Sequence, residues 1–292
     1  MATIIDGKKI AADVRAELKD KVEKMVAEKK KRPALAVILV GDDPASKIYV
    51  RNKQKACEEI GIASELYTLG ADIRQESLEF IIRSLAERND IDGILLQMPI
   101  PKHLDAEKAL FCIPPEKDVD AFHPVNTGLL LRGDYHFLPC TPAGIIELLF
   151  RNNIDIAGKE CVVVGRSDIV GKPMAIMLMH SGGTVTVCHR GTSDLRFHTG
   201  RADILVSAVG KPHFITGDMV KEGAVVVDVG INHDEEGKLC GDVEFAEVEP
   251  KASAITPVPG GVGPMTVAML MKNTVTAAEL ALQREEEKKQ NG

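Results

Sequence analysis

The sequence lacks the marks of a membrane or secreted protein. None of its apolar runs approaches the roughly 20 residues that are needed to span a bilayer. The N-terminal stretch MATIIDGKKIAADVRAELKD contains no basic segment followed by an apolar one, which is the pattern of a secretion signal. We therefore expect a protein that has no membrane partner and works in the cytoplasm.

A surplus of positive charge is also missing. The 292 residues include 36 Lys and Arg against 43 Asp and Glu, a formal net charge of −7. Proteins that bind nucleic acid usually show a basic surplus or stripe, so we expect no nucleic-acid partner. The one dense basic run, Lys29–Arg32, follows a charged helical pattern, and we interpret it as a solvated helix end. The length and the ordinary globular composition favour two domains.

Patterns of metal binding and of disulfide pairing are absent as well. The six cysteines are scattered, form no C-x-x-C pair and mostly have apolar neighbours. We interpret them as reduced structural thiols of a cytosolic protein. The eight histidines show no H-E-x-x-H spacing, so we expect no metal site.

Short apolar runs alternate with helical patterns along both halves of the chain. In the first half we predict strands at 35–41 and 63–70, a strand that runs into a proline-rich turn at 92–101, and helices at 46–61 and 74–88. In the second half we predict helices at 143–153 and 171–183, and strands at 160–165, 184–190, 202–210 and 223–232. This alternation is typical of parallel sheets with helical crossovers. A proline-rich change between 114–126 and 139–144 marks the predicted boundary, and a final helix follows from 266.

The stretch VVVGRSDIVGKP (162–173) almost matches a dinucleotide fingerprint. Gly165 follows an apolar run and Gly171 stands where a helix begins, but Ser167 replaces the middle glycine of G-x-G-x-x-G. Gly165 can form the tight turn, and Gly171 with Pro173 can start a helix whose N-terminus attracts phosphate. Ser167 keeps the backbone farther from a ligand but offers a hydroxyl to a phosphate. An ordinary strand-loop-helix turn explains the stretch as well as a nucleotide loop does.

The end of the next strand bears on the choice of nucleotide. An NAD site usually has Asp or Glu there, which accepts hydrogen bonds from the ribose 2′-OH. This chain has His189 and Arg190 instead, and Arg166 lies in the first loop. Because arginine can pair with a 2′-phosphate through two hydrogen bonds, the pattern favours NADP over NAD. A solvent-exposed cation at a strand end explains Arg190 equally well.

Several polar residues of the first half stand at positions that suit a site. Tyr49 and Lys53 are four residues apart and share a helix face, although most lysines on helices are simply solvated. Gln97 ends an apolar strand, where open parallel sheets bind ligands, although it could merely cap that strand. Asp118 and Asp120 lie in a short turn. An aspartate there can bind the amidine-like edge of a heterocycle or serve the turn itself.

The stretch PVPGGVGPMT (257–266) is the most unusual of the chain. Its prolines and glycines suit neither a helix nor a central strand, so we predict a loop. Such a loop is either a tight structural turn or a place where the backbone approaches a ligand closely. The two glycine elements at the end of the last predicted strand favour the close approach.

The chain resembles the bifunctional methylenetetrahydrofolate dehydrogenase/methenyltetrahydrofolate cyclohydrolase family in eight motifs that occur in the same order: VGDDPASKIYVRNK, LLQMPIP, PEKDVDAFHP, PCTPAG, VVVGRSDIVGKP, TVTVCHR, DVGIN and ITPVPGGVGPMTVAML. The resemblance implies an α/β fold of two α/β domains across a cleft. It assigns 1–139, completed by the helix 266–292, to a folate-binding catalytic domain. It assigns 140–265 to an NADP-binding Rossmann-type domain, and it implies a homodimer.

The resemblance also implies an activity and a set of residues. The family oxidises 5,10-methylenetetrahydrofolate with NADP and hydrolyses the methenyl product to 10-formyltetrahydrofolate, a one-carbon donor for purine biosynthesis. Lys53 matches the lysine required for hydrolysis, and Gln97 matches the glutamine that contacts it. Tyr49 matches the tyrosine that stacks near the folate, and Asp120 the aspartate that holds the pterin. The implied cofactor and nicotinamide–folate loops contain Gly165, Arg166, Ser167, Arg190, Thr141, Gly230, Ile231, Pro259, Gly260, Gly263 and Thr266.

Two other functions compete with this one. The first is a monofunctional NADP dehydrogenase that has lost hydrolysis, and the second is a nucleotide-sensing module without catalysis. The presence of Lys53, Gln97 and Asp120 speaks against both, because neither needs this set of residues.

Overall fold

The computed structural model describes residues 2–28 and 31–291. The chain divides into two compact units, each made of two stretches. Unit 1 contains the residues up to Ala12 together with Pro139–Thr266, and unit 2 contains Asp13–Leu138 together with the residues from Val267 onward. The N-terminal residues, expected in the first domain, join unit 1 because β1 (Thr3–Ile4) pairs in parallel with β11 (Ala254–Ile255).

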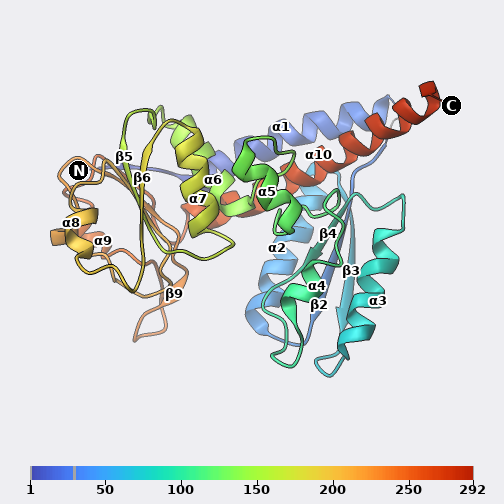
Figure 1. Cartoon of the computed structure of the whole chain (residues 1–292), viewed down its shortest axis with the longest axis horizontal. Helices are drawn as coiled ribbons and strands as arrows, with labels where there is room; N and C mark the ends of the chain where they lie inside the picture. The colour runs from blue at the N-terminus through green and yellow to red at the C-terminus, as the bar shows by residue number, and fades with distance from the viewer. Residues whose placement is uncertain (1, 29–30, 292) are drawn as a thin grey trace. The chain divides into compact units, whose positions relative to one another are not determined.

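Unit 2 is built on a three-stranded parallel sheet. The strands are β2 (Ala34–Val40), β3 (Ala63–Leu69) and β4 (Gly93–Leu96), in the order β3-β2-β4. Every residue of the central β2 is buried, as expected for a parallel strand that is covered on both faces. Helices α2 (Pro44–Ile60) and α3 (Gln75–Ala86) lie on opposite sides of this sheet (Figure 1).

A side-chain cap and a proline set the start of helix α2, and a glycine sets its end. The Asp43 carboxylate accepts a hydrogen bond from Ser46 N at 2.7 Å, and Pro44 needs no partner at the first helical position. Gly61 ends the helix with φ 89°, a conformation that costs glycine little. These signals fix the direction in which α2 leaves the carboxyl end of β2.

Two long helices complete unit 2. From Asp13 onward α1 (Gly7–Ala27) runs alongside α10 (Val262–Asn291), where Lys21 and Glu279 form an ion pair at 2.8 Å (Figure 1). The shorter helices are α4 (Ala106–Leu110) and α5 (Pro124–Arg132). Helix α10 begins four residues before the predicted 266, so the prediction of a loop up to that point was wrong. The first turn of a helix leaves its N–H groups without intrahelical partners and therefore tolerates Pro264.

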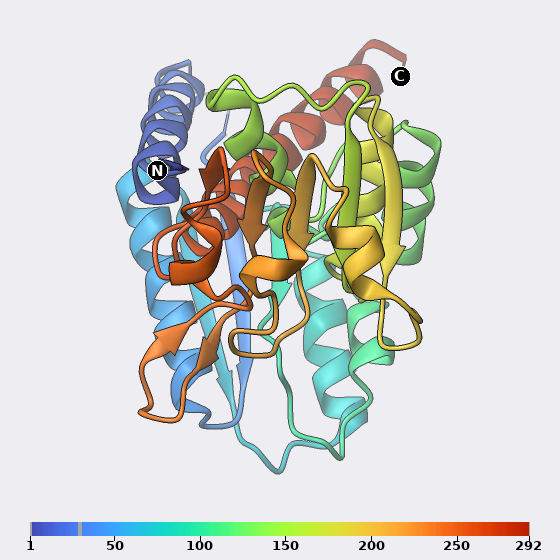
Figure 2. The ribbon, with the colours of Figure 1, turned by 90° about the vertical axis from the view of Figure 1, so that its left-hand side faces the viewer.

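Unit 1 contains a six-stranded parallel sheet with the order β1-β11-β8-β7-β5-β6 (Figure 2). Its longer strands are β5 (Glu160–Val164), β6 (Thr184–Cys188), β7 (Ile204–Ser207) and β8 (Val225–Asp228). The helices are α6 (Cys140–Arg151), α7 (Gly171–His180), α8 (Leu195–Thr199), α9 (Phe245–Val248) and the 3-10 turn Gly217–Met219. The antiparallel hairpin of β9 (Asn232–His233) and β10 (Leu239–Cys240) follows the carboxyl end of β8. β5 lies between β6 and β7, so the strand order reverses there, as in Rossmann-type sheets.

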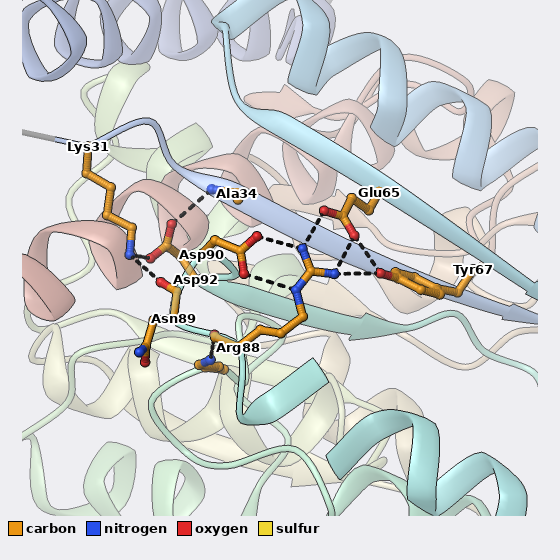
Figure 3. A network of polar contacts seen from close by, with 9 residues as sticks. Lys31, Ala34, Glu65, Tyr67, Arg88, Asn89, Asp90 and Asp92 are labelled. Atoms are coloured by element: carbon orange, nitrogen blue, oxygen red, sulfur yellow. Dashed lines mark hydrogen bonds and ion pairs between the residues drawn. The ribbon is translucent and has the colours of Figure 1, made fainter. Parts of the chain in front are cut away.

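In the basic run Lys29–Arg32, the described residue Lys31 does not lie at a solvated helix end. Residues 29 and 30 lie outside the described residues, and α1 ends at Ala27. The Lys31 ammonium forms an ion pair at 2.6 Å with Asp92, whose carboxylate also accepts a hydrogen bond from Ala34 N (Figure 3). Burial raises the pKa of Asp92, and Lys31 opposes that shift. The interpretation of the run was therefore wrong for Lys31, which neutralises a buried carboxylate beside β2.

A second polar cluster ties the edge strand β3 to the segment after α3 (Figure 3). The Arg88 guanidinium donates to both carboxylate oxygens of Glu65, at 2.7 and 2.8 Å, and to the Tyr67 hydroxyl at 2.8 Å. It also donates to Asp90, and this contact lowers the pKa of that carboxyl to about 2. The cluster places charged side chains on an edge strand, where charge discourages pairing with another strand.

The cysteines are all free thiols, and five of the six are buried. None of the helices within residues 2–28 and 31–291 is long and apolar enough to cross a membrane.

Candidate functional site

The part of the candidate site in unit 2 is centred on Lys53 and Gln97. Lys53 lies on α2 and is half-buried, and its ammonium donates to Gln97 Oε1 at 2.9 Å. Gln97 directly follows β4 and is only 7 % exposed. Its Nε2 donates to the Met98 carbonyl at 2.7 Å, which fixes the amide so that its oxygen faces the lysine. The lysine is thereby held at the carboxyl end of the sheet, where open parallel sheets bind ligands.

Tyr49 lies on the same helix as Lys53, and Asp120 lies on another element of unit 2. Tyr49 stands one turn before Lys53 on α2 and is 39 % exposed, so its ring is accessible. Asp120 is half-buried in the turn that follows a parallel bridge between Ile94 and Asp118. Because that turn runs parallel to β4, it carries Asp120 towards the same strand end as Gln97.

Asp118 stabilises the turn that presents Asp120. Its carboxylate is buried and accepts hydrogen bonds from His123 N at 2.7 Å and from Asn126 Nδ2 at 2.9 Å. Burial raises the pKa of Asp118, and these hydrogen bonds oppose the shift. Of the two aspartates in the motif, Asp118 therefore serves the turn, whereas Asp120 is only half-buried.

In unit 1, the loop between β5 and α7 closes on itself through two glycines. Gly165 has φ 132°, and a Cβ there would overlap the Ala208 carbonyl oxygen. A Cβ on Gly171 would overlap the Gly165 carbonyl oxygen and lie 2.7 Å from Arg166 N. Gly165 N also donates to the Cys188 carbonyl of β6 at 2.9 Å. Side chains at either position would force the start of α7 away from β5.

The three polar candidates of this edge are all exposed, which leaves them accessible to a ligand. Ser167 Oγ accepts hydrogen bonds from Val170 N at 3.2 Å and from Gly171 N at 3.3 Å. It therefore supports the start of α7, and the hydroxyl still has its own hydrogen to donate. Arg166 lies beside it in the loop, and Arg190 lies just beyond the end of the neighbouring strand β6.

The remaining candidates of unit 1 surround the carboxyl ends of β8 and β11. Ile231 is 51 % exposed in the loop after β8, next to the buried Gly230. Thr141 on α6 and Thr266 on α10 have their hydroxyl oxygens 3.0 Å apart. The other candidates lie between β11 and the first turn of α10, namely Pro259, Gly260 and Gly263. Gly260 has φ 115°, so a left-handed backbone conformation explains the glycine at that position.

Two buried carboxylates beside these loops were not predicted from the sequence. Asp228 ends β8 and Asp242 follows β10, and both accept several hydrogen bonds from loop backbone. Asp228 is the first residue of the motif DVGIN, but no role was assigned to it, and Asp242 belongs to none of the eight motifs. The only local sign was an aspartate at the end of an otherwise apolar strand, VVVD.

Comparison with known families decides between the competing interpretations. The profile of the tetrahydrofolate dehydrogenase/cyclohydrolase catalytic domain matches residues 5–120. The profile of the NAD(P)-binding domain of the same family matches residues 139–282. The chain belongs to the tetrahydrofolate dehydrogenase/cyclohydrolase family. The resemblance expected from the motifs is confirmed, and with it the dehydrogenase and cyclohydrolase function of the family.

Relatives of known name and structure agree along nearly the whole chain. Bifunctional protein FolD of Acetivibrio thermocellus is 57 % identical over 279 residues, which cover 96 % of this chain and 98 % of the relative. The crystal structure of FolD from Campylobacter jejuni is 50 % identical with a TM-score of 0.93, and covers 96 % of this chain and 99 % of its own. FolD of Trypanosoma brucei, solved with NADP and an inhibitor, is 40 % identical with a TM-score of 0.91. The match covers 96 % of this chain and 98 % of the Trypanosoma chain. The expected α/β fold with a Rossmann-type domain is thus confirmed.

Proposed function

We propose that this protein oxidises 5,10-methylenetetrahydrofolate with NADP and hydrolyses the methenyl product to 10-formyltetrahydrofolate. The observation that carries the proposal is the 2.9 Å contact of Lys53 Nζ with Gln97 Oε1 at the carboxyl end of β4. A dehydrogenase without hydrolysis has no need of an oriented lysine there. The relatives named as bifunctional support both activities.

Hydride transfer is mainly a problem of positioning. NADP, when bound, supplies the hydride acceptor, and the folate carbon must be held against it. The turn of Gly165 and Gly171 fits a dinucleotide, because a Cβ at either position would fill the space in which the loop closes. We assign the 2′-phosphate and pyrophosphate to Arg166, Ser167 and Arg190, and the nicotinamide side to Ile231 and Thr141.

Hydrolysis needs a group that moves protons. Water attacks the cationic methenyl carbon, a proton leaves that water, and another reaches the nitrogen when its bond to carbon breaks. We assign this transfer to Lys53, held in orientation by Gln97. Tyr49 offers an accessible ring for the folate, and the Asp120 carboxylate can accept two hydrogen bonds from the pterin edge. The loop residues Pro259, Gly260 and Gly263 are assigned to the folate as well.

We expect Arg190→Ser to weaken the use of NADP and to leave the use of NAD almost unchanged. The side chain pairs with the 2′-phosphate, which NAD lacks. Hydrogen bonds to charged groups are worth about 1.5–3 kcal/mol, so the KM for NADP should rise about 10- to 150-fold. Steady-state dehydrogenase assays with both cofactors measure this difference.

Arg201→Ser is the matched control for Arg190→Ser. Arg201 is an exposed arginine of unit 1 that pairs with Glu160 at the amino end of β5, away from the proposed cofactor edge. We expect it to change the KM of neither cofactor. An equal loss with NAD and NADP in the Arg190 variant would refute the role at the 2′-phosphate.

We also propose that the protein is a homodimer that pairs through the β6 side of unit 1. β6 is an edge strand, and Phe150 of α6, Met179 of α7 and Val187 of β6 are 76 %, 52 % and 39 % exposed. An exposed apolar group beside an open strand edge is typical of an interface. Light scattering should give about twice the 31.6 kDa of one chain.

Charge placed in this surface should separate the copies. We expect the double variant Phe150→Glu/Val187→Lys to scatter light as a monomer. Phe80→Glu is the control, since Phe80 is 70 % exposed, close to the value for Phe150, but lies on α3 of unit 2. A wild-type monomer, or dimers in all three proteins, would rule out this interface.

The assay that tests the whole proposal mixes the enzyme with 5,10-methylenetetrahydrofolate and either NADP or NAD, and follows NADPH and the methenyl product together. NADPH formation with little methenyl accumulation is the expected result. Accumulation of methenyl product would leave a monofunctional dehydrogenase, and no turnover would favour the sensing module. The six free thiols fit the reducing cytoplasm, where we propose that the product supplies purine biosynthesis.

A further inference from the structure

Two buried carboxylates occupy the carboxyl edge of the sheet in unit 1. Asp242 is fully buried and Asp228 is 3 % exposed. The Asp242 carboxylate accepts hydrogen bonds from Val209 N at 2.6 Å, Asn232 Nδ2 at 2.9 Å, Lys211 N at 3.0 Å and Ser207 Oγ at 3.2 Å. Asp228 accepts from Gly230 N, Asp242 N and Val243 N, each at 2.9 Å.

These contacts join the loops that lie beyond the paired residues of neighbouring strands. Asp242 binds both the loop that follows β7 and the loop that follows β8, and it lies itself just after β10. The Asp228 carboxylate binds backbone N–H groups on both sides of the β9–β10 hairpin. The Asp228 N–H donates to Thr256 Oγ1, just beyond β11, at 2.8 Å. Three adjacent strand ends of the sheet therefore share one network.

The network leaves little freedom to the loop after β8. A Cβ on Gly230 would overlap Asp242 Oδ1, and a Cβ on Gly241 would overlap the Asp228 carboxylate. Burying a carboxylate is costly unless hydrogen-bond donors compensate it. Here seven hydrogen-bond donors converge on the two carboxylates. The loops are therefore most stable in the one arrangement in which all seven donors reach a carboxylate oxygen.

We infer that Asp242 is a positioning residue for the nicotinamide half of NADP, because it fixes the loop of Gly230 and Ile231 against the loop after β7. The inference rests on the proposed function, in which Ile231 lies at the nicotinamide. Asp242 itself is fully buried, so we assign its effect to the loops that it holds. The adenosine half is held at β5 and β6 by other residues, so Asp242 should affect the two halves of the cofactor differently.

The test compares the whole cofactor with a fragment of it in Asp242→Asn. The amide replaces one acceptor oxygen with a donor that faces other donors, so the loops shift. Misplacing reacting groups by about 1 Å can cost about 100-fold, and we expect kcat/KM for NADP to fall about 10- to 100-fold. The dissociation constant of adenosine 2′,5′-bisphosphate, which lacks the nicotinamide, should stay at the wild-type value.

A milder variant and a matched control complete the experiment. Asn232→Ala removes one of the four donors to Asp242, and we expect a smaller loss of the same kind. Asp203→Asn is the control, since the Asp203 carboxylate also ties strands together, through Glu160 N at 3.0 Å, but at the amino edge of the sheet. It should lower the unfolding temperature without changing kcat/KM for NADP.

The outcomes separate this inference from the proposed function. A wild-type protein without NADP-dependent oxidation contradicts the proposed function. An active wild type whose Asp242 and Asn232 variants keep their kcat/KM, or lose binding of the fragment equally, overturns the inference alone. If Asp242→Asn does not fold, Asn232→Ala decides by the same two measurements.

Discussion

Replacing Lys53 with methionine should abolish hydrolysis while leaving much of the dehydrogenase activity. Methionine keeps the length and the apolar stem of the side chain but cannot carry a proton. General acid–base catalysis contributes about 10²- to 10⁴-fold, so we expect the cyclohydrolase kcat to fall by at least about 100-fold. Hydride transfer depends on positioning and should fall much less. Loss of the absorbance of added methenyltetrahydrofolate, with the enzyme-free rate subtracted, measures hydrolysis.

The controls for Lys53→Met come from the same network and the same helix. Lys55→Met removes an exposed lysine from α2 and should change neither activity. Gln97→Ala removes the acceptor of the 2.9 Å contact, and we expect a partial loss of hydrolysis, because the lysine remains but is less well oriented. If Lys53→Met hydrolysed the methenyl substrate at the wild-type rate, another group would have to move the proton.

Much of the fold follows from patterns that are local in the sequence. The apolar runs of β2 and β5 become buried central strands because parallel sheets need apolar residues on both faces. Gly61 ends α2 as its position predicted, because a left-handed residue there costs least when it is glycine. The start of α10 was predicted too late. Glycine and proline are unfavourable inside a helix, but the first turn of a helix tolerates them.

Contacts between residues far apart in the sequence escaped prediction. β1 has only two residues, too few to show a period, so nothing indicated that the N-terminus completes the sheet of unit 1. Lys31 reads as part of a charged run, yet it pairs with Asp92, which is remote in the chain. The network of Asp228 and Asp242 depends on a hairpin that returns the chain to the end of β8. Such contacts depend on the folded path of the backbone rather than on residue spacing.

We expect Gly171→Ala to cost most of the NADP-dependent oxidation. The φ of Gly171 lies outside the left-handed region, so the effect comes from packing alone. The added Cβ would overlap the Gly165 carbonyl oxygen and lie 2.6 Å from its carbon, and backbone atoms cannot yield without opening the loop. Overpacking usually costs about 1–3 kcal/mol. If this cost is expressed as an opening of the loop between β5 and α7, the affinity for NADP falls about 5- to 150-fold.

A loss of oxidation with hydrolysis retained would distinguish an opened cofactor loop from unfolding of the whole protein. The residues assigned to hydrolysis lie in unit 2, whereas Gly171 lies in unit 1. Gly171→Ala should therefore still hydrolyse added methenyltetrahydrofolate while its KM for NADP rises. Gly128→Ala is the control: a Cβ there meets no atom within 4 Å, and alanine within α5 should stabilise the fold by up to about 1 kcal/mol. Unchanged NADP binding in Gly171→Ala would show that the close approach of β5 and α7 is not what holds the cofactor.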